Sequence, residues 1–283
     1  MPSETAAKPS RDNLFLDLSL PEGERRLAAR RLGAVGDGPT LVFLHEALGS
    51  IGQWKGFPED LAAASGLPGL VYERQGHGRS SPLSLPRAGD YLRHEAEVVL
   101  PAVLAAAGID RPVLCGHSDG ATIALMYAAA FPEQAAGCPL ACVVLAPHVM
   151  VEEVTLAGIR AADQDPRAPE IRHRLARYHG DGAEDLWRAW TETWLRPGFA
   201  ACEMRADLPR IACPVLAIQG EDDAYGSDDQ ITLIAAGASG PVETLFLPAC
   251  GHQPHLEQRP AVVEECHRFF SRCGLLSPHV LQR

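Results

Sequence analysis

A serine between two glycines is the residue of this chain best placed to do chemistry. Ser118 is the centre of Gly116-His117-Ser118-Asp119-Gly120, which follows a short apolar run and precedes an alanine-rich stretch with helical apolar spacing. This order is typical of a strand, a tight turn and a helix, with the serine at the apex. Glycines at both flanking positions let strand and helix approach each other. A glycine-punctuated turn without chemistry is the alternative interpretation.

A serine hydroxyl is a weak nucleophile at neutral pH, so it needs a base and a group that orients that base. Two predicted strands end in residues suited to these roles. Gln219-Gly220-Glu221-Asp222-Asp223 follows one of them, and Pro248-Ala249-Cys250-Gly251-His252 follows the next. Side chains at the carboxyl ends of parallel strands work together at one edge of a sheet. The candidate nucleophile, acid and base therefore occur in the order Ser118, Asp223, His252.

The elements that must position these residues alternate between short apolar strands and helices. This alternation is typical of a mostly parallel sheet covered by helices on both faces, an α/β fold. We expect an antiparallel hairpin first, then buried strands separated by helices. The predicted strands are 14–20, 26–32, 40–44, 69–74, the run before Ser118, 141–146, 214–218 and 242–247. The predicted helices are 57–65, 91–107, the segment from the serine turn to 131, 228–236 and 260–272.

The strand–helix alternation stops between residues 148 and 210, where helical periodicity continues without a strand. We interpret 148–210 as a helical lid inserted into a core domain of 13–147 and 211–283, after a disordered tail of 1–12. Trp187, Trp190 and Trp194 are spaced so that they fall on one face of a helix. They either fix the lid to the main domain or line the pocket and favour an aromatic or hydrophobic substrate.

Four motifs in register resemble the α/β-hydrolase fold superfamily, in its lid-bearing group of esterases, lactonases and carbon–carbon bond hydrolases. The resemblance runs from about residue 14 to 272 and implies that Ser118 is the nucleophile, His252 the general base and then acid, and Asp223 the orienting carboxylate. It implies no cofactor and no metal. The motifs are the Gly-x-Ser-x-Gly turn, Gly220-x-x-Asp223 after a strand, Gly251-His252 followed by Pro254-His255-Leu256-Glu257, and Arg74-Gln75-Gly76-His77-Gly78-Arg79-Ser80, which is similar to the family's Arg-x-Gly-x-Gly-x-Ser turn.

The resemblance also implies an oxyanion hole made by the backbone N–H groups of Asp119 and Ala47. The chain departs from the family at Glu46, where glycine is usual. We expect Glu46 to form a structural salt bridge with Arg74, with a catalytic carboxylate as the alternative. A carboxylate beside developing negative charge is unfavourable, so Asp119 should point out of the hole or contact an arginine or a polar substrate group.

Neighbouring residues compete for two of these roles. Glu221 or Asp222 could be the acid instead, but the family's three-residue offset from glycine favours Asp223. His255 competes with His252, yet it falls where a helix begins. The side chain of His117 should point away from the site, as a packed or hydrogen-bonded neighbour.

Composition narrows the class of protein. The 283 residues are 46% hydrophobic and 22% charged, as in a soluble globular protein. The net charge of −11 argues against nucleic acid or an anionic membrane as a partner. The N-terminus lacks the apolar core of a signal peptide, so we expect a cytoplasmic protein. Eight cysteines without a Cys-x-x-Cys pair indicate buried reduced thiols rather than a metal site.

These observations predict a serine hydrolase that cleaves a small carboxylic ester through an acyl-serine intermediate. Its partner would be a small-molecule acyl substrate, and the sequence leaves the oligomeric state open, a homodimer included. Lactone, thioester or carbon–carbon bond hydrolysis would use the same three residues, as would a haloperoxidase side activity. A binding protein on the same scaffold is the alternative from another class, and it predicts loss of a triad residue, which the sequence does not show.

Overall fold

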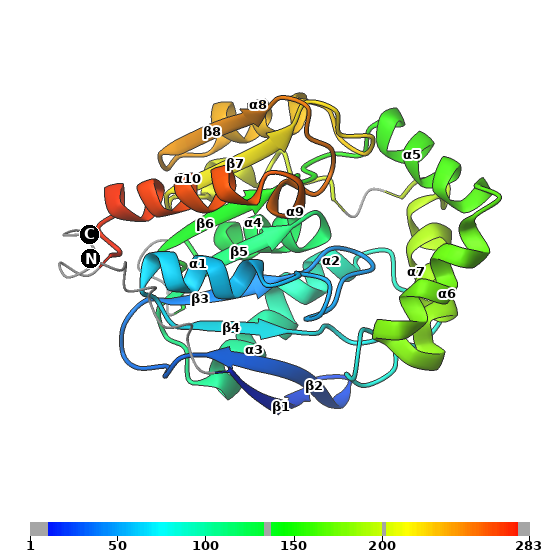
Figure 1. Ribbon diagram of the computed structural model, residues 1–283, viewed down its shortest axis with the longest axis horizontal. Helices are drawn as coiled ribbons and strands as arrows, with labels where there is room; N and C mark the ends of the chain where they lie inside the picture. The colour runs from blue at the N-terminus through cyan, green and yellow to red at the C-terminus, as the bar shows by residue number, and fades with distance from the viewer. Residues whose placement is uncertain (1–10, 133–136, 200–201, 277–283) are drawn as a thin grey trace, which may run out of the picture.

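Eight strands form one sheet in the computed structural model, which describes residues 11–132, 137–199 and 202–276 (Figure 1). The strand order is β1-β2-β4-β3-β5-β6-β7-β8. The strands are β1 (Arg11–Leu20), β2 (Gly23–Leu32), β3 (Thr40–Leu44), β4 (Gly69–Tyr72), β5 (Pro112–His117), β6 (Ala141–Leu145), β7 (Val215–Gly220) and β8 (Val242–Leu247).

The strands from β3 to β8 run parallel, and β2 is antiparallel to both β1 and β4. The expected mostly parallel sheet with a leading hairpin is therefore confirmed. Leu20 pairs with Gly23 across the hairpin turn. Strand β1 begins at Arg11, inside the expected disordered tail of 1–12, while residues 1–10 lie outside the described part of the chain.

Helices cover both faces of the sheet, because the central strands are apolar on both sides. In β3, Leu41 and Phe43 pack on one face, and Val42 and Leu44 on the other. Figure 1 shows α1 and α10 in front of the sheet and α4 and α8 behind it. The helices of these two layers are α1 (Phe57–Ser65), α3 (Leu100–Ala107), α4 (Asp119–Ala130), α8 (Asp229–Gly237) and α10 (Arg259–Arg272), with the short α9 (Pro254–Glu257) before α10.

The helix predicted for 91–107 is not uniform. The chain forms α2 (Tyr91–His94), one π-helical stretch η1 (Glu95–Val99) and then α3. Pro101 has no N–H to donate to the preceding turn, so the regular hydrogen-bond pattern cannot run through it. The predicted end is confirmed, since Gly108 caps α3 with φ 68°.

Three longer helices follow β6 and precede β7, and between 148 and 210 the described residues form no strand. They are α5 (Glu153–Gln164), α6 (Ala168–His179) and α7 (Ala183–Trp194), with the short 3₁₀ turns η2 (Gly180–Gly182) and η3 (Leu208–Arg210). In Figure 1 they stand to the right of the sheet.

All eight cysteines lie in the described part of the chain, and six of them are buried. Cys138 and Cys273 are half-buried. The prediction that most of the cysteines are buried is confirmed. Among the residues that the structure describes, we find no helix with both the length and the apolar character needed to span a membrane.

Candidate active site

The turn around Ser118 brings strand β5, strand β3 and helix α4 into unusually close contact. A Cβ atom on Gly116 would lie 2.3 Å from the carbonyl oxygen of Gly120. A Cβ atom on Gly120 would lie 2.0 Å from the carbonyl oxygen of Leu44. Any side chain at either position would force the helix away from the sheet, so both glycines are required for the tight strand-to-helix turn that the sequence predicts.

Ser118 itself has a strained backbone, with φ 52° and ψ −117°. Such a conformation costs on the order of 1–3 kcal/mol for a residue with a side chain. Neighbouring strands hold it in place: Ser118 N–H donates to Leu145 O at 2.9 Å, at the end of β6. Ala146, which follows Leu145 in the chain, also has a positive φ of 47°. Its N–H donates to Ile218 O of β7 at 2.8 Å. The turn is therefore fixed through the pairing of three strands.

The structure brings His252 and Asp223 together as a hydrogen-bonded pair. His252 Nδ1 lies 2.8 Å from Asp223 Oδ2 and 2.9 Å from Oδ1, and the Asp223 side chain is 1% exposed. The same carboxylate accepts Gln219 Nε2 at 2.8 Å and Tyr225 N–H at 2.8 Å. Burial acts to raise the pKa of Asp223, but the contact with His252 and then the hydrogen bond from Tyr225 N–H lower it on balance. The aspartate thus stays ionised and leaves Nε2 of His252 as the free ring nitrogen.

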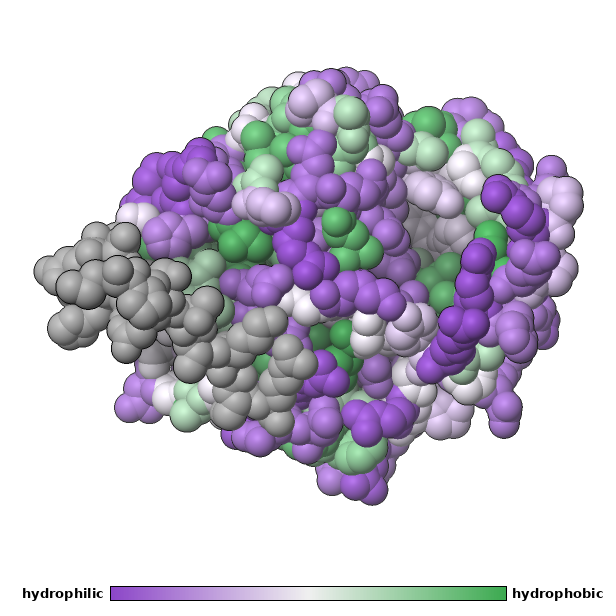
Figure 2. Space-filling model, in the orientation of Figure 1, coloured by the Kyte–Doolittle hydropathy of each residue, from purple (hydrophilic) through white to green (hydrophobic). Residues whose placement is uncertain are grey.

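Ser118 and His252 line the same cavity, which has a volume of about 230 Å³. Ala47 and Asp119 line it as well. In the described part of the chain, no hydrogen bond joins the Ser118 hydroxyl to His252. Catalytic hydrogen bonds are often long in unliganded sites and tighten when substrate binds. Figure 2 shows the surface hollowed between the body of the molecule and the hydrophilic helical rim formed by α6.

The competing acids and histidines occupy other places. Glu221 and Asp222 are exposed, whereas Asp223 contacts the histidine. His255 is 3% exposed and packs its ring 4.9 Å from that of Trp54. His117 Nε2 donates to the main-chain oxygen of His252 at 2.7 Å, which matches its expected role as a hydrogen-bonded neighbour.

The backbone N–H groups of Ala47 and Asp119 have no acceptor among the described residues. The carbonyl of Glu46, in the same peptide unit as the Ala47 N–H, accepts Arg74 Nη2 at 2.9 Å and His45 Nδ1 at 2.7 Å. Because C=O and N–H point in opposite directions in a trans peptide, these bonds fix the direction of the Ala47 N–H. Two unpaired donors beside the serine are the geometry that an oxyanion requires.

The expected salt bridge between Glu46 and Arg74 is wrong. Arg74 binds the main-chain carbonyl of Glu46, and its guanidinium pairs instead with Asp119 at 3.6 Å. The Glu46 carboxylate turns away, accepts Leu48 N–H at 2.8 Å and faces the cavity. Burial raises the pKa of Glu46. Asp119 also accepts the Tyr91 hydroxyl at 2.7 Å, so the expectation that it contacts an arginine is confirmed.

Two of the three tryptophans of α7 have the roles foreseen for them, and Trp187 has neither. Trp187 Nε1 donates to Asp163 of α5 at 2.8 Å and joins two of the three helices. Trp190 and Trp194 line the cavity. Trp194 Nε1 also donates to Tyr91 OH at 3.0 Å, which ties α7 to α2.

His148 and Tyr225 are among the cavity residues that the sequence did not predict. The Tyr225 ring lies 4.9 Å from the His252 ring, and His148 Nε2 lies 3.1 Å from the Tyr225 carbonyl oxygen. His148 follows the end of β6, at the edge where functional residues of parallel sheets gather, and that position was an available signal. No group of three or more metal-ligating side chains is arranged to hold a metal ion within the described ranges.

Comparison with known proteins agrees with this architecture. Solved structures with the same fold include a thermophilic esterase from Thermogutta terrifontis, with 16% identity, 93% of this chain and 99% of that chain covered, and a TM-score of 0.68. An enol-lactonase from Burkholderia xenovorans has 16% identity, 90% and 99% coverage, and a TM-score of 0.68. A putative lipase from Acinetobacter baumannii has 15% identity, 93% and 92% coverage, and a TM-score of 0.72.

At these identities the structures establish the fold alone, and no curated protein sequence matches the chain. The family model described as the alpha/beta hydrolase family matches residues 41–265, which include the serine turn, the aspartate and the histidine. This chain therefore belongs to the alpha/beta hydrolase family and is a hydrolase.

Proposed function

We propose that the protein is a serine hydrolase that cleaves a small carboxylic ester through an acyl-serine intermediate. The observation that supports this most is the hydrogen-bonded Asp223–His252 pair, whose histidine lines one cavity with a serine held on a strained turn. In this proposal Ser118 is the nucleophile, His252 the general base and acid, and Asp223 the orienting carboxylate.

The proposed reaction has two steps. His252 Nε2 takes the Ser118 proton as the oxygen attacks the substrate carbonyl, and the negative charge on the carbonyl oxygen is stabilised by the N–H groups of Asp119 and Ala47. His252 then protonates the departing alcohol, which leaves an acyl-serine. Water, deprotonated by the same histidine, releases the acid in the second step.

We further propose that helices α5 to α7 act as the lid of this site. Ile159 of α5, Leu175 of α6, and Trp190 and Trp194 of α7 supply apolar wall to the cavity around Ser118. These side chains favour an apolar acyl group of limited size. Lactone, thioester and carbon–carbon bond hydrolysis on the same residues remain alternatives, and the enol-lactonase shows that the fold is compatible with lactone chemistry in that protein.

Hydrolysis of chromogenic acyl esters from acetate to octanoate, and of benzoate, tests the proposal. We expect the wild-type protein to hydrolyse some of them and Ser118→Ala to lose about 10⁴-fold or more of kcat. Asp223→Asn should lose about 10⁴-fold, because the histidine then adopts the wrong tautomer. Asp222→Asn, in the same loop but exposed, is the matched control and should keep its activity.

Equal activity of Ser118→Ala and the wild-type protein would show that another residue is the nucleophile. A wild-type protein that hydrolyses none of these esters would contradict the proposal that its substrate is a small carboxylic ester. A panel of lactones and diketones, measured with the same variants, would then decide between the remaining reactions.

A further inference from the structure

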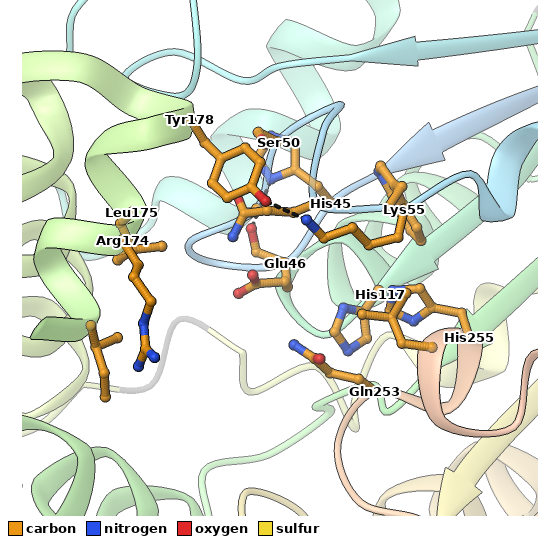
Figure 3. Close-up of a pocket in the computed structure, with 15 residues that line it drawn as sticks. His45, Glu46, Ser50, Lys55, His117, Arg174, Leu175, Tyr178, Gln253 and His255 are labelled. Atoms are coloured by element: carbon orange, nitrogen blue, oxygen red, sulfur yellow. Dashed lines mark hydrogen bonds between the residues drawn. The ribbon is translucent and has the colours of Figure 1, made fainter. Parts of the chain in front are cut away.

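A second cavity adjoins the proposed catalytic one and is about twice its size, with a volume of about 460 Å³. The two cavities share the side chains of Glu46, Gln53, Leu175 and Gln253. A molecule bound at Ser118 can therefore extend past these four residues into the outer cavity. Figure 3 shows the outer cavity between helix α6 on one side and the loops that carry Glu46 and Gln253 on the other.

The wall of the outer cavity holds polar atoms that lack partners. Ser50 Oγ, Trp54 Nε1 and His255 Nδ1 are buried and have no hydrogen bond to any of the described residues. Leaving a buried polar group unpaired costs about 1–3 kcal/mol, so such groups usually bind a ligand or water. Burial lowers the pKa of His255 to about 3, so this imidazole is neutral and adds no charge.

Two cations give the outer cavity its charge, and both are exposed side chains that line it. Arg174 extends from α6 along one side of the cavity, across from Gln253 (Figure 3). Lys55 Nζ approaches the Tyr178 hydroxyl from the opposite loop and lies 4.8 Å from the centre of the Tyr178 ring. Neither cation pairs with a carboxylate in the part of the chain that the structure describes.

Two other arginines of the same three helices pair with carboxylates. Arg160 contacts Glu153 at 2.6 Å, and Arg172 contacts Glu184 at 3.1 Å. Arg174 has no carboxylate partner among the described residues, in contrast to Arg160 and Arg172. Arg177, also on α6 and exposed, has no carboxylate partner among the described residues either, but it does not line the cavity.

The distance between α6 and the loop that carries Lys55 is fixed by close packing. A Cβ atom on Gly52 would lie 3.0 Å from the Tyr178 ring, so only glycine fits there without displacing the tyrosine. His179 Nε2 lies 3.0 Å from Leu48 O, and its Nδ1 accepts Gly78 N–H at 2.9 Å. The cavity wall is therefore preformed rather than assembled by a ligand.

Glu46 is the one acid among the residues that line the outer cavity. Its carboxylate accepts the Leu48 N–H, and the residue lines both cavities. Two cations thus outweigh one acid among the residues that line the outer cavity, and this balance matches a ligand with a negative charge.

We propose that the outer cavity binds a carboxylate carried by the substrate, with Arg174 as its principal partner and Lys55 as a second cation. This inference rests on the proposed function and narrows its substrate class to esters that carry an anionic group beyond the scissile bond. The carboxylate belongs either to the acyl part or to the leaving alcohol, and the two sources can be separated with synthetic esters.

The test compares three esters of similar size. 4-Nitrophenyl butyrate is neutral, the 4-nitrophenyl monoester of glutarate carries the carboxylate on the acyl part, and 4-carboxyphenyl butyrate carries it on the leaving group. We expect Arg174→Ala to lower kcat/KM about tenfold for one anionic ester and to leave the neutral ester unchanged, because a charge-assisted contact is lost. Arg177→Ala is the matched control and should change none of the three.

The anionic ester that responds identifies which part of the substrate occupies the outer cavity. Equal effects of Arg174→Ala on the neutral ester and on both anionic esters would overturn the inference while hydrolysis itself still stood. Titration calorimetry with glutarate and with 4-hydroxybenzoate separates the two proposals. Carboxylate binding that weakens in Arg174→Ala, in a protein that hydrolyses no ester, would uphold the anion site and reject the proposed function. Ester hydrolysis by a protein that neither binds these carboxylates nor prefers the anionic esters would uphold the proposed function and reject the anion site.

Discussion

Arg74 and Asp119 form an ion pair with a separation of 3.6 Å, and both side chains are only 1% exposed. Asp119 directly follows Ser118 and supplies one of the two proposed oxyanion donors. Its carboxylate is held by the Arg74 guanidinium and the Tyr91 hydroxyl. The negative charge next to the nucleophile is therefore matched within the protein rather than by substrate.

Arg74→Met should lower the free energy of unfolding by about 3–5 kcal/mol, because it leaves the Asp119 charge buried without its partner. Adding Asp119→Asn removes that charge and should restore part of the loss. Urea unfolding of the two single variants and the double variant measures the coupling between the residues. Losses that simply add in the double variant would contradict this account of the pair.

Ser118→Gly should stabilise the fold by about 1 kcal/mol relative to Ser118→Ala, while both variants lose activity. Glycine adopts the positive φ of 52° without strain, whereas alanine keeps the strained Cβ. The comparison of urea midpoints between these two inactive variants isolates the backbone effect. A glycine variant less stable than the alanine variant would mean that the turn is not strained.

Stability should fall as the pH drops below about 6.5, the ordinary pKa of an unfolded histidine. Burial, as the first cause, lowers the pKa of six histidines in the folded protein, so the unfolded chain binds more protons in the range between the folded and unfolded values. Each such group removes up to about 1.4 kcal/mol of stability per pH unit in that range. The six are His45, His77, His117, His148, His179 and His255.

His255→Phe gives a measurement of one member of this group. The pKa of His255 is lowered to about 3, and its ring already packs 5.5 Å from Phe57, so phenylalanine suits the site. Urea unfolding at pH 6.5, 5.5 and 4.5 should show a shallower loss of stability in the variant, by about 1.4 kcal/mol per pH unit. An unchanged slope would show that His255 binds a proton in the folded state.

Trp190→Ala should shift the preferred acyl chain to longer esters. The indole lines the cavity of about 230 Å³ around Ser118, so its removal enlarges the space for the acyl group. Trp187→Ala is the matched control, since this indole binds Asp163 and does not line the cavity. Values of kcat/KM across acetate to octanoate report the shift, and an identical change in both variants would point to general loosening of α7 instead.

The sequence predicted most of the fold because its signals are local. Apolar runs such as 40–44 can only be strands buried on both faces, and the bounds of α1 and β3 agree with the prediction. The serine turn was predictable for the same reason, because Gly116 and Gly120 mark the places where backbones meet. The order of serine, aspartate and histidine then located the three candidate residues at one sheet edge.

Other parts of the site depend on directions that a sequence does not encode. The sequence predicted a contact between Glu46 and Arg74, but through the wrong group. Arg74 binds the main-chain carbonyl of Glu46, while the Glu46 carboxylate accepts Leu48 N–H and faces the cavity. The outer cavity draws Lys55, Arg174 and His255 from three separate segments. No spacing or periodicity links these segments, and their proximity follows only from the way α6 packs on the loop after β3.

The hydrogen bonds that hold the serine turn also set an order of assembly during protein synthesis. Ser118 N–H is bound by the end of β6, and the strained Ala146 beside that end is bound by Ile218 of β7. Because β7 follows α5 to α7 in the sequence, the hydrogen bond from Ala146 to Ile218 can form only after these helices have been synthesised. The hydrogen-bonded surroundings of Ser118 are therefore completed late in biosynthesis.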